Sequence, residues 1–114
     1  MADYRLYPRA NAAQDRIWRY TLETWGEAQA VAYLEGLHAH FQKLTLSPQI
    51  WRKLPSNFQK AGRDQAAVHF SRYGQHYIFF KVLKNGDLGI MSILHGRTDM
   101  PARLLSDLAA LSLE

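Results

Sequence analysis

Cysteine is absent from this sequence of 114 residues. Disulfide bonds, thiolate zinc sites and a cysteine nucleophile are therefore excluded. Long apolar runs are absent too, since none approaches the roughly 18 residues that a membrane-spanning helix requires. The first residues lack the apolar stretch of a secretory signal. These absences lead us to expect a cytoplasmic protein.

Acidic residues are in the minority, with 10 Asp and Glu against 14 Lys and Arg, which gives a formal net charge of +4. A positive excess attracts an acidic partner, which can be a nucleic acid, an anionic membrane surface or an acidic protein. The hydrophobic content of 47% and the charged content of 21% are those of an ordinary globular protein. We therefore predict one folded domain over residues 1–114.

The N-terminal half predicts a strand followed by two helices. Side chains alternate over residues 4–7, which suits a short strand, and Pro8 stands where proline commonly begins a helix. Gly26 predicts the tight turn that separates the helices, and the second helix is expected to end near Ser47-Pro48. The apolar positions at helical spacing are Ala13, Ile17, Tyr20 and Trp25 in the first helix and Ala30, Leu34, Leu37, Phe41 and Leu44 in the second. A short connection makes the helices an antiparallel hairpin.

The C-terminal half predicts a sheet after a polar loop over residues 51–65. Strands are expected at 67–70, 75–83 and 88–94, with a turn at 72–74 and a hairpin turn at Asn85-Gly86. The run 77–83 is aromatic and β-branched, which is typical of a central strand buried on both faces. Residues 103–111 predict a short C-terminal helix. The predicted fold is therefore α+β, a helical hairpin on a small antiparallel sheet in the order β-α-α-β-β-β.

Three segments resemble the ParE branch of the ParE/RelE toxin superfamily. Residues 17–37 resemble the family's helical hairpin with its Trp-Gly elbow, here Trp25-Gly26. Residues 74–82 are similar to its strand pattern of His, apolar, Ile, two aromatics, basic and Val. Residues 93–101 resemble its C-terminal box of Leu-His-x-Arg-x-Asp. The loop at 51–65 lacks the Gly-Arg and Leu-Arg pattern of many relatives, and the tail after Arg103 is longer than the family leads us to expect.

The superfamily contains two mechanisms, which the residues help to separate. RelE-like members resemble ribonucleases that use strand lysines, arginines and a C-terminal tyrosine to move protons and hold phosphorane charge. The two lysine positions fall here on Val68 and Phe70, the first arginine on Tyr77 and the tyrosine on Arg103, so that only Arg97 matches. ParE-like members resemble proteins that poison DNA gyrase by binding it without catalysis. The missing nuclease groups favour this second mechanism.

A rearranged nuclease site is the alternative. His69, His76 and His95 lie on the same predicted sheet, and histidine serves as acid or base near neutral pH. If the protein is a ribonuclease, we predict Arg97, His76 and His95 as its catalytic residues. The competing interpretation is that these histidines complete hydrogen bonds within the sheet. We predict no metal site, since His38 and His40 point to different faces of a helix, and no cofactor.

Positive charge concentrates between residues 51 and 86, where seven basic residues accompany only Asp64. This favours a binding surface for an acidic partner, and a solvated loop that keeps the protein soluble is the alternative interpretation. Trp51 is either an exposed anchor or a loop-packing residue. The residues predicted to bind a target or antitoxin are Trp51, Arg52, Lys53, Arg72, Lys81, Arg97, Leu104, Leu105 and Leu108.

The resemblance implies a toxin of a type II toxin–antitoxin system, inhibiting growth through DNA gyrase. Its expected partners are gyrase and a cognate antitoxin that is acidic and partly disordered, wrapping the groove between the helical hairpin and the sheet. We expect no membrane partner and no direct sequence-specific binding of nucleic acid except through the antitoxin. The alternatives are a RelE-like ribosome-dependent mRNA interferase and an inactive module that only binds antitoxin.

Overall fold

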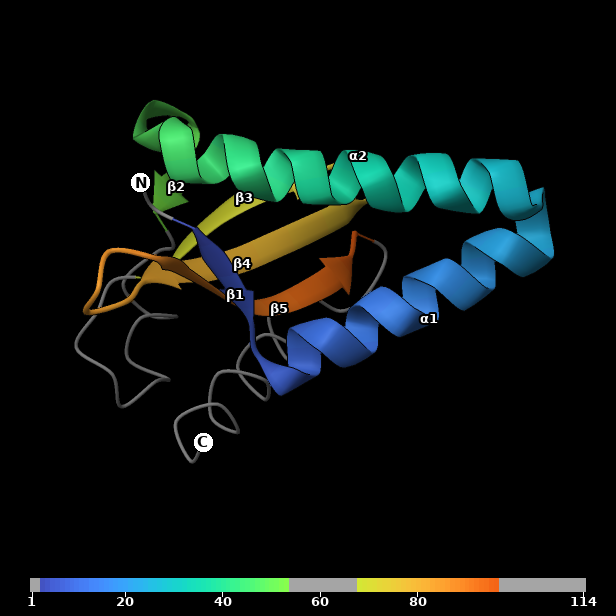
Figure 1. The fold of residues 1–114 in the computed structure, drawn as a ribbon, viewed down its shortest axis with the longest axis horizontal. Helices are drawn as coiled ribbons and strands as arrows, with labels where there is room; N and C mark the ends of the chain where they lie inside the picture. The colour runs from blue at the N-terminus through green and yellow to red at the C-terminus, as the bar shows by residue number, and fades with distance from the viewer. Residues whose placement is uncertain (1–2, 54–67, 97–114) are drawn as a thin grey trace.

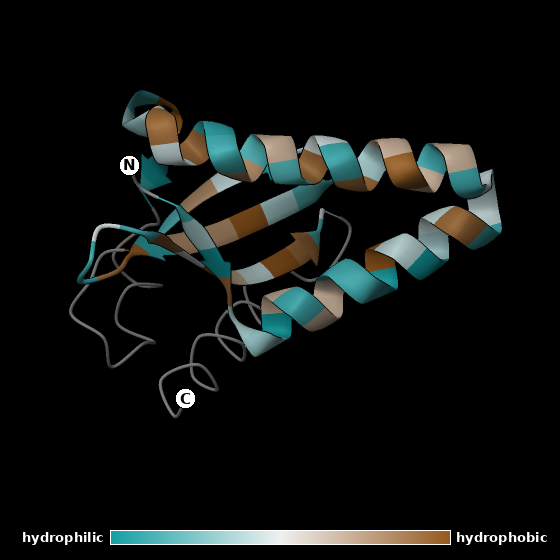
Figure 2. Cartoon of the chain, in the orientation of Figure 1, coloured by the Kyte–Doolittle hydropathy of each residue, from teal (hydrophilic) through white to brown (hydrophobic). Residues whose placement is uncertain are grey.

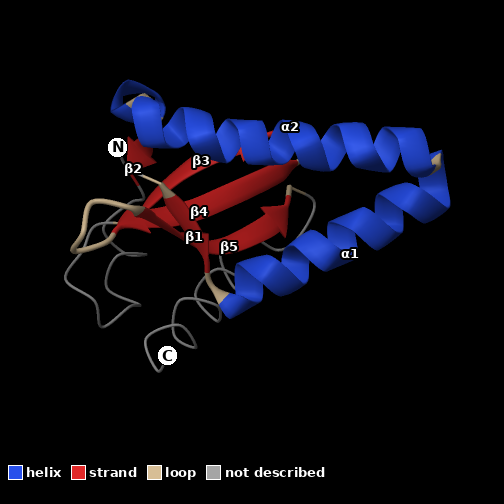
Figure 3. Cartoon of the chain, in the orientation of Figure 1, coloured by secondary structure: helices blue, strands red, loops and turns tan. Residues whose placement is uncertain are grey.

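The computed structural model describes residues 3–53 and 68–96. Its elements are β1 (Tyr4–Leu6), α1 (Pro8–Trp25), α2 (Glu27–Leu46), the short 3-10 helix η1 (Pro48–Ile50), β2 (Arg52–Lys53), β3 (His69–Tyr73), β4 (His76–Val82) and β5 (Leu88–His95). Two helices lie on one face of a five-stranded sheet, as Figure 3 shows. The predicted α+β architecture with a helical hairpin is confirmed.

A proline marks the start of the helical hairpin and a glycine marks its turn. Pro8 occupies the first turn of α1, where its missing N–H costs no hydrogen bond. Gly26 has a φ of 93°, a left-handed conformation that other residues rarely adopt, and it separates the two helices. The second helix ends at Leu46, directly before Ser47 and Pro48. In Figure 1 the helices diverge from this elbow, which overhangs the end of the sheet.

The strands follow the order β1-β5-β4-β3-β2. The strands β3, β4 and β5 pair antiparallel as predicted, and β2 adds a further antiparallel neighbour to β3. In contrast, β1 runs parallel to β5, with Tyr4 opposite Leu88. A parallel pair requires a long crossover connection, and the whole helical hairpin precedes β5 in the chain. Strand β2 lies within the stretch predicted as a loop. The predicted turn at 72–74 also begins later, because Arg72 and Tyr73 still belong to β3.

The main core lies between the hairpin and the sheet. Its members alternate with polar residues along the helices, as the hydropathy colours of Figure 2 show. The buried side chains are Ala10, Ala13, Ile17, Leu37, Phe41, Leu44, Ile78, Phe80, Leu88, Ile90 and Ile93. Burying these apolar surfaces supplies most of the driving force for folding.

Two aromatic residues of the apolar stripe predicted for the first helix lie outside this core. Tyr20 is 63% exposed and Trp25 is 69% exposed, while Trp18 stands at 36%. Their helical spacing is correct, but they belong to the last turns of α1, which end at the elbow. Among the described strands, none reaches past the elbow in Figure 1. The buried stripe of α1 instead consists of Ala10, Ala13, Ile17 and Thr21.

The sheet also has a second apolar face. Val68, Phe79, Met91 and Leu94 form a buried cluster there, with Tyr7, Phe70 and Tyr77 packed against it. Ile78 and Phe80 on the same strand belong to the main core, so β4 is buried on both faces as predicted.

An irregularity in the β4–β5 pairing decides which side chains of β5 face the helices. Phe79 pairs with Ser92, whereas Phe80 pairs with Ile90, so Met91 is the extra residue of a β-bulge. Ile90 and Ile93 are three residues apart, yet both reach the main core. A regular strand would place them on opposite faces. The bulge therefore also brings His95 to the helix side of the sheet, opposite His76.

Candidate functional site

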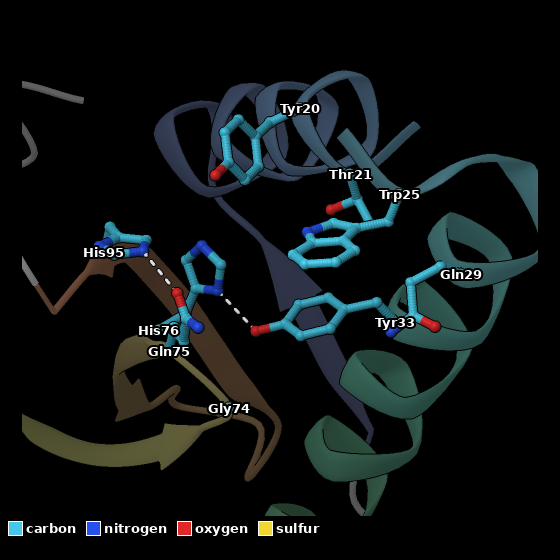
Figure 4. Close-up of a pocket in the computed structure, with 9 residues that line it drawn as sticks. All are labelled: Tyr20, Thr21, Trp25, Gln29, Tyr33, Gly74, Gln75, His76 and His95. Atoms are coloured by element: carbon cyan, nitrogen blue, oxygen red, sulfur yellow. Dashed lines mark hydrogen bonds between the residues drawn. The ribbon is translucent and has the colours of Figure 1, made fainter. Parts of the chain in front are cut away.

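The elbow overhang and the β3–β4 turn enclose an open pocket of about 600 Å³. Figure 4 shows side chains from both layers converging on it. The hairpin contributes Tyr20, Thr21, Trp25, Gln29 and Tyr33, and the sheet contributes Gly74, Gln75, His76 and His95. Its volume falls within the range of pockets that hold small molecules.

A histidine pair forms the sheet side of the pocket. His76 lies opposite His95 in the β4–β5 register, and their rings meet edge to face with centroids 5.2 Å apart. Burial, and secondarily the neighbouring His95, lower the pKa of His76 to about 4. The imidazole of His76 is therefore neutral at physiological pH. His95 shares a hydrogen bond of 3.1 Å between its Nε2 and Oε1 of Gln75.

Tyr33 links the hairpin to this pair. Its hydroxyl shares a 2.7 Å hydrogen bond with Nδ1 of His76 and donates to the carbonyl oxygen of Tyr73 at 3.3 Å. Burial raises the pKa of the Tyr33 phenol, so the phenol remains protonated. Gly74 makes this approach feasible, because an added Cβ there would stand 2.6 Å from the Tyr33 hydroxyl oxygen. The network fixes His76 through Nδ1 and leaves Nε2 for another partner.

A second pocket of about 350 Å³ adjoins the first, sharing Gln75 and His95 with it. Its other lining residues are Arg72, Tyr77 and Gly96. The guanidinium carbon of Arg72 lies 5.5 Å from the Tyr77 ring centroid, and its Nε donates to the Gly74 carbonyl oxygen at 3.0 Å. These contacts orient the cation without neutralising it. Cation–π geometry of this kind is common for arginine.

The remaining described binding candidates lie elsewhere. Trp51 packs against His69 and Phe80, and its indole N–H donates to the Leu44 carbonyl oxygen at 2.8 Å. Of the two interpretations of Trp51, an exposed anchor or a packing residue, these contacts favour the packing residue. Arg52 and Lys53 are exposed on the edge strand β2. Lys81 projects on β4 with its ammonium nitrogen 5.7 Å from the ring centroid of Tyr7.

Arg97, Leu104, Leu105 and Leu108 lie outside the described residues, as does the C-terminal helix predicted for 103–111. Within residues 3–53 and 68–96, no group of three or more potential ligands is arranged to hold a metal ion. His38 instead shares a hydrogen bond with the Tyr4 hydroxyl at 2.7 Å, and His40 shares one with Ser71 at 2.9 Å. No helix in the described part of the chain is long and apolar enough to cross a membrane.

Sequence reasoning identified His76, His95 and Arg72 but missed the residues that the hairpin adds to them. Tyr20 and Trp25 were expected on the apolar stripe of the first helix because their spacing is helical, and Gln29 and Gln75 were not singled out. The overlooked signal is the Trp-Gly elbow itself. A large aromatic residue next to the turn has the least neighbouring structure to bury it.

The histidine pair predicts a specific acid response. In the unfolded chain His76 titrates near 6.5, whereas in the folded chain it titrates at about 4. Above pH 6.5 both states are neutral there, so this part of the stability is fully present. As pH falls toward 4, His76 binds a proton in the unfolded state but stays neutral in the folded state, so stability is lost. We expect His76→Gln to flatten the dependence of the urea midpoint on pH in this window.

His40 contributes a background pH dependence to that measurement. Burial and the nearby Lys43 also lower its pKa, so it contributes a loss in the same direction in both proteins. A residual slope is therefore expected in His76→Gln, smaller than in the parent chain. Identical slopes would show that His76 is not the buried titrating group that the geometry describes.

Comparison with known proteins was informative over nearly the whole chain. The family described as "ParE toxin of type II toxin-antitoxin system, parDE" matches residues 4–100. Toxin ParE1 of Caulobacter vibrioides is 31% identical over 104 residues, covering 91% of this chain and 99% of that protein. Toxin ParE1 of Mycobacterium tuberculosis H37Rv is 30% identical over 101 residues, covering 89% and 96%. Toxin ParE of Escherichia coli is 28% identical over 104 residues, covering 91% and 94%.

Proposed function

This chain belongs to the ParE toxin family of type II toxin–antitoxin systems, and we propose that it acts by binding and poisoning DNA gyrase. It does so without catalysis of its own, and a cognate antitoxin neutralises it. The proposal requires a rigid docking surface and no reactive centre. The family supplies the toxin identity, and the residues described above argue for the mode of action.

One observation carries the choice of mechanism. The positions where a RelE-like nuclease would place two lysines and an arginine hold Val68, Phe70 and Tyr77. Val68 is only 7% exposed, and the two aromatic rings pack against the same apolar cluster on the second face of the sheet. Such side chains neither move a proton nor hold phosphorane charge. Three cooperating groups are replaced by packing, which typically costs a nuclease orders of magnitude in rate.

The histidine pair keeps the mRNA interferase alternative worth testing. His76 and His95 lie together in a pocket, and a neutral imidazole accepts a proton. However, a pKa of about 4 makes His76 a weak base at neutral pH and leaves almost none of it protonated to act as an acid. Efficient general catalysis needs a pKa near the working pH. This argues against His76 as the central group of a nuclease.

The antitoxin is proposed to be acidic because three exposed cations lie on two neighbouring strands, in addition to those on other elements. Arg52, Lys53 and Arg72 are all exposed on β2 and β3, at one side of the sheet. An acidic partner meeting these residues would associate faster and would lose affinity as salt is raised. The proposed antitoxin segment follows the groove between the hairpin and the sheet.

The gyrase proposal predicts the outcome of a supercoiling assay with purified gyrase and relaxed plasmid. We expect the wild-type chain to inhibit supercoiling and to accumulate cleaved gyrase–DNA complexes. His76→Ala should keep this inhibition within a few fold, because no catalytic step is lost. If His76 were a general acid or base, its removal would lower activity by about 10²–10⁴-fold.

The same preparations should be incubated with translating ribosomes as the control reaction. Intact message is expected for both the wild-type chain and Arg97→Ala. Cleavage that disappears in Arg97→Ala would establish the interferase mechanism instead. A chain that neither inhibits gyrase nor cleaves message, and whose expression leaves growth unaffected, would be the inactive antitoxin-binding module.

A further inference from the structure

Exposed aromatic side chains line the pocket at the elbow. Trp25 and Tyr20 are large aromatic residues whose surfaces are mostly in water, and Tyr33 lies beside Trp25 in Figure 4. Exposed aromatic faces that converge on a cavity are a feature of ligand sites, because leaving them solvated forgoes the free energy of burial. These faces provide a stacking surface for a flat ring.

The described residues of the same pocket include no Lys, Arg or carboxylate side chain. The nine described residues that line it are aromatic, hydroxyl, amide, imidazole or glycine residues. Gln29 and Gln75 carry amides that both donate and accept, and His76 presents Nε2 because Tyr33 occupies Nδ1. Neutral donors and acceptors around an aromatic wall suit an uncharged heterocycle with hydrogen bonds on its edge. They do not suit a phosphate or carboxylate, since an anion would be desolvated there without a counter-charge.

A second pocket, which contains a cation, adjoins this one. The adjoining pocket shares Gln75 and His95 with it and contains the guanidinium of Arg72. Among the described residues no carboxylate pairs with that guanidinium, whose Nε is held by the Gly74 carbonyl oxygen. Because the Nε is occupied, the terminal N–H groups are the ones available for an oxyanion. Arginine in this arrangement is well suited to phosphate.

We propose that the two adjoining pockets together bind one nucleotide, with its base in the aromatic pocket and its phosphate beside Arg72. The base stacks on Trp25 and hydrogen-bonds along its edge to the amides and to His76. The phosphate meets Arg72 on the far side of the Gln75–His95 hydrogen bond. This inference does not depend on gyrase being the target, and no chemical step is involved.

A peptide side chain fits these observations less well. An apolar side chain would leave the amides and the imidazole nitrogen without hydrogen bonds, which carries a desolvation cost. An acidic side chain would fit beside Arg72 but would leave the aromatic pocket unused. A nucleotide uses both pockets at once, because it joins a flat hydrogen-bonding ring to an anion.

Fluorescence polarisation of a short, labelled, single-stranded oligodeoxynucleotide at about 50 mM salt tests the proposal. Trp25→Ala is expected to weaken binding about tenfold, the typical effect of removing one stacking side chain. Arg72→Gln is expected to weaken it similarly and to reduce the salt dependence by about one released counterion. Trp18→Ala and Arg52→Gln are the matched controls, since both residues are exposed outside the pockets.

Two further probes separate the source of the nucleotide. If unlabelled nucleoside 5′-monophosphates displace the oligonucleotide at comparable concentration, the site takes free nucleotides. If only strands compete, the site takes an unpaired nucleotide within a strand. Either result supports the proposal when Trp25→Ala and Arg72→Gln impair binding and the controls do not.

Three results would overturn it. The first is no binding of strands or of monophosphates at millimolar concentration. The second is equal weakening by Arg52→Gln and Arg72→Gln, which indicates general adhesion to positive charge. The third is normal nucleotide binding by Trp25→Ala. Trp25 lies outside the core, so a folding defect is not expected to obscure these comparisons.

Discussion

Phe41→Ala is expected to lower the free energy of unfolding by about 3–5 kcal/mol. Phe41 is fully buried, and its ring meets those of Tyr4 and His38 at centroid distances of 5.2 and 5.4 Å. Removing it leaves a cavity between α2 and β1 that these neighbours cannot fill without leaving their own contacts. Since a domain of this size is stable by about 5–15 kcal/mol in total, much of the stability is lost. Urea denaturation at equilibrium measures the change.

Trp25→Ala is the matched control, because it removes a larger aromatic ring from the same hairpin. Trp25 is 69% exposed, so its loss should change the free energy of unfolding by less than about 0.5 kcal/mol. The two residues were equivalent in the helical periodicity, and only the structure distinguishes them. Equal losses from the two substitutions would mean that the elbow is buried in solution and that the fold described here is incorrect at that end.

Gly36→Ala is expected to destabilise the protein by about 1–3 kcal/mol, against the usual trend for helices. Alanine in a helix interior is normally about 1 kcal/mol better than glycine. Here an added Cβ would overlap the hydroxyl of Tyr73, whose ring crosses α2 at this position. The Tyr73 ring cannot easily move aside, since Tyr33 and His40 flank it at centroid distances of 5.2 and 5.5 Å.

Tyr73→Phe tests the cause of that loss, because it deletes only the oxygen that the new Cβ would meet. In the Gly36→Ala background it should recover most of the lost stability, while alone it should have a small effect. A double-mutant cycle on the urea midpoints gives the coupling between the two positions. No coupling, or a stabilising Gly36→Ala, would mean that Tyr73 does not cross the helix at Gly36.

Most of the secondary structure was predictable because its signals are local. A helical stripe such as Leu37, Phe41 and Leu44 needs only the 3.6-residue period, and Asn85-Gly86 needs only the conformational preference of its turn. The parallel pairing of β1 and the short strand β2 were not predictable in this way. Which strands become neighbours depends on contacts between residues far apart in the chain.

The candidate site was only half visible in the sequence. His76, His95 and Arg72 were identified from their residue types, yet nothing local indicated that His76 and His95 would meet. The bulge at Met91 decides this, since it changes which side chains of β5 face the helices. The lowered pKa of His76 follows mainly from burial and secondarily from the neighbouring His95. Neither the contact between His76 and His95 nor the lowered pKa of His76 exists until the hairpin packs on the sheet.

The sequence by itself determined the class of fold, the positive charge and the replacement of nuclease side chains by Val68, Phe70 and Tyr77. These follow from residue identity and from periods of a few residues, which survive in any conformation of the chain. Only the tertiary structure decided that the hairpin extends past the sheet, leaving Trp25 exposed at a pocket that adjoins the one lined by Arg72. The lengths of helices and strands are local properties, but how far one layer overhangs another depends on their packing.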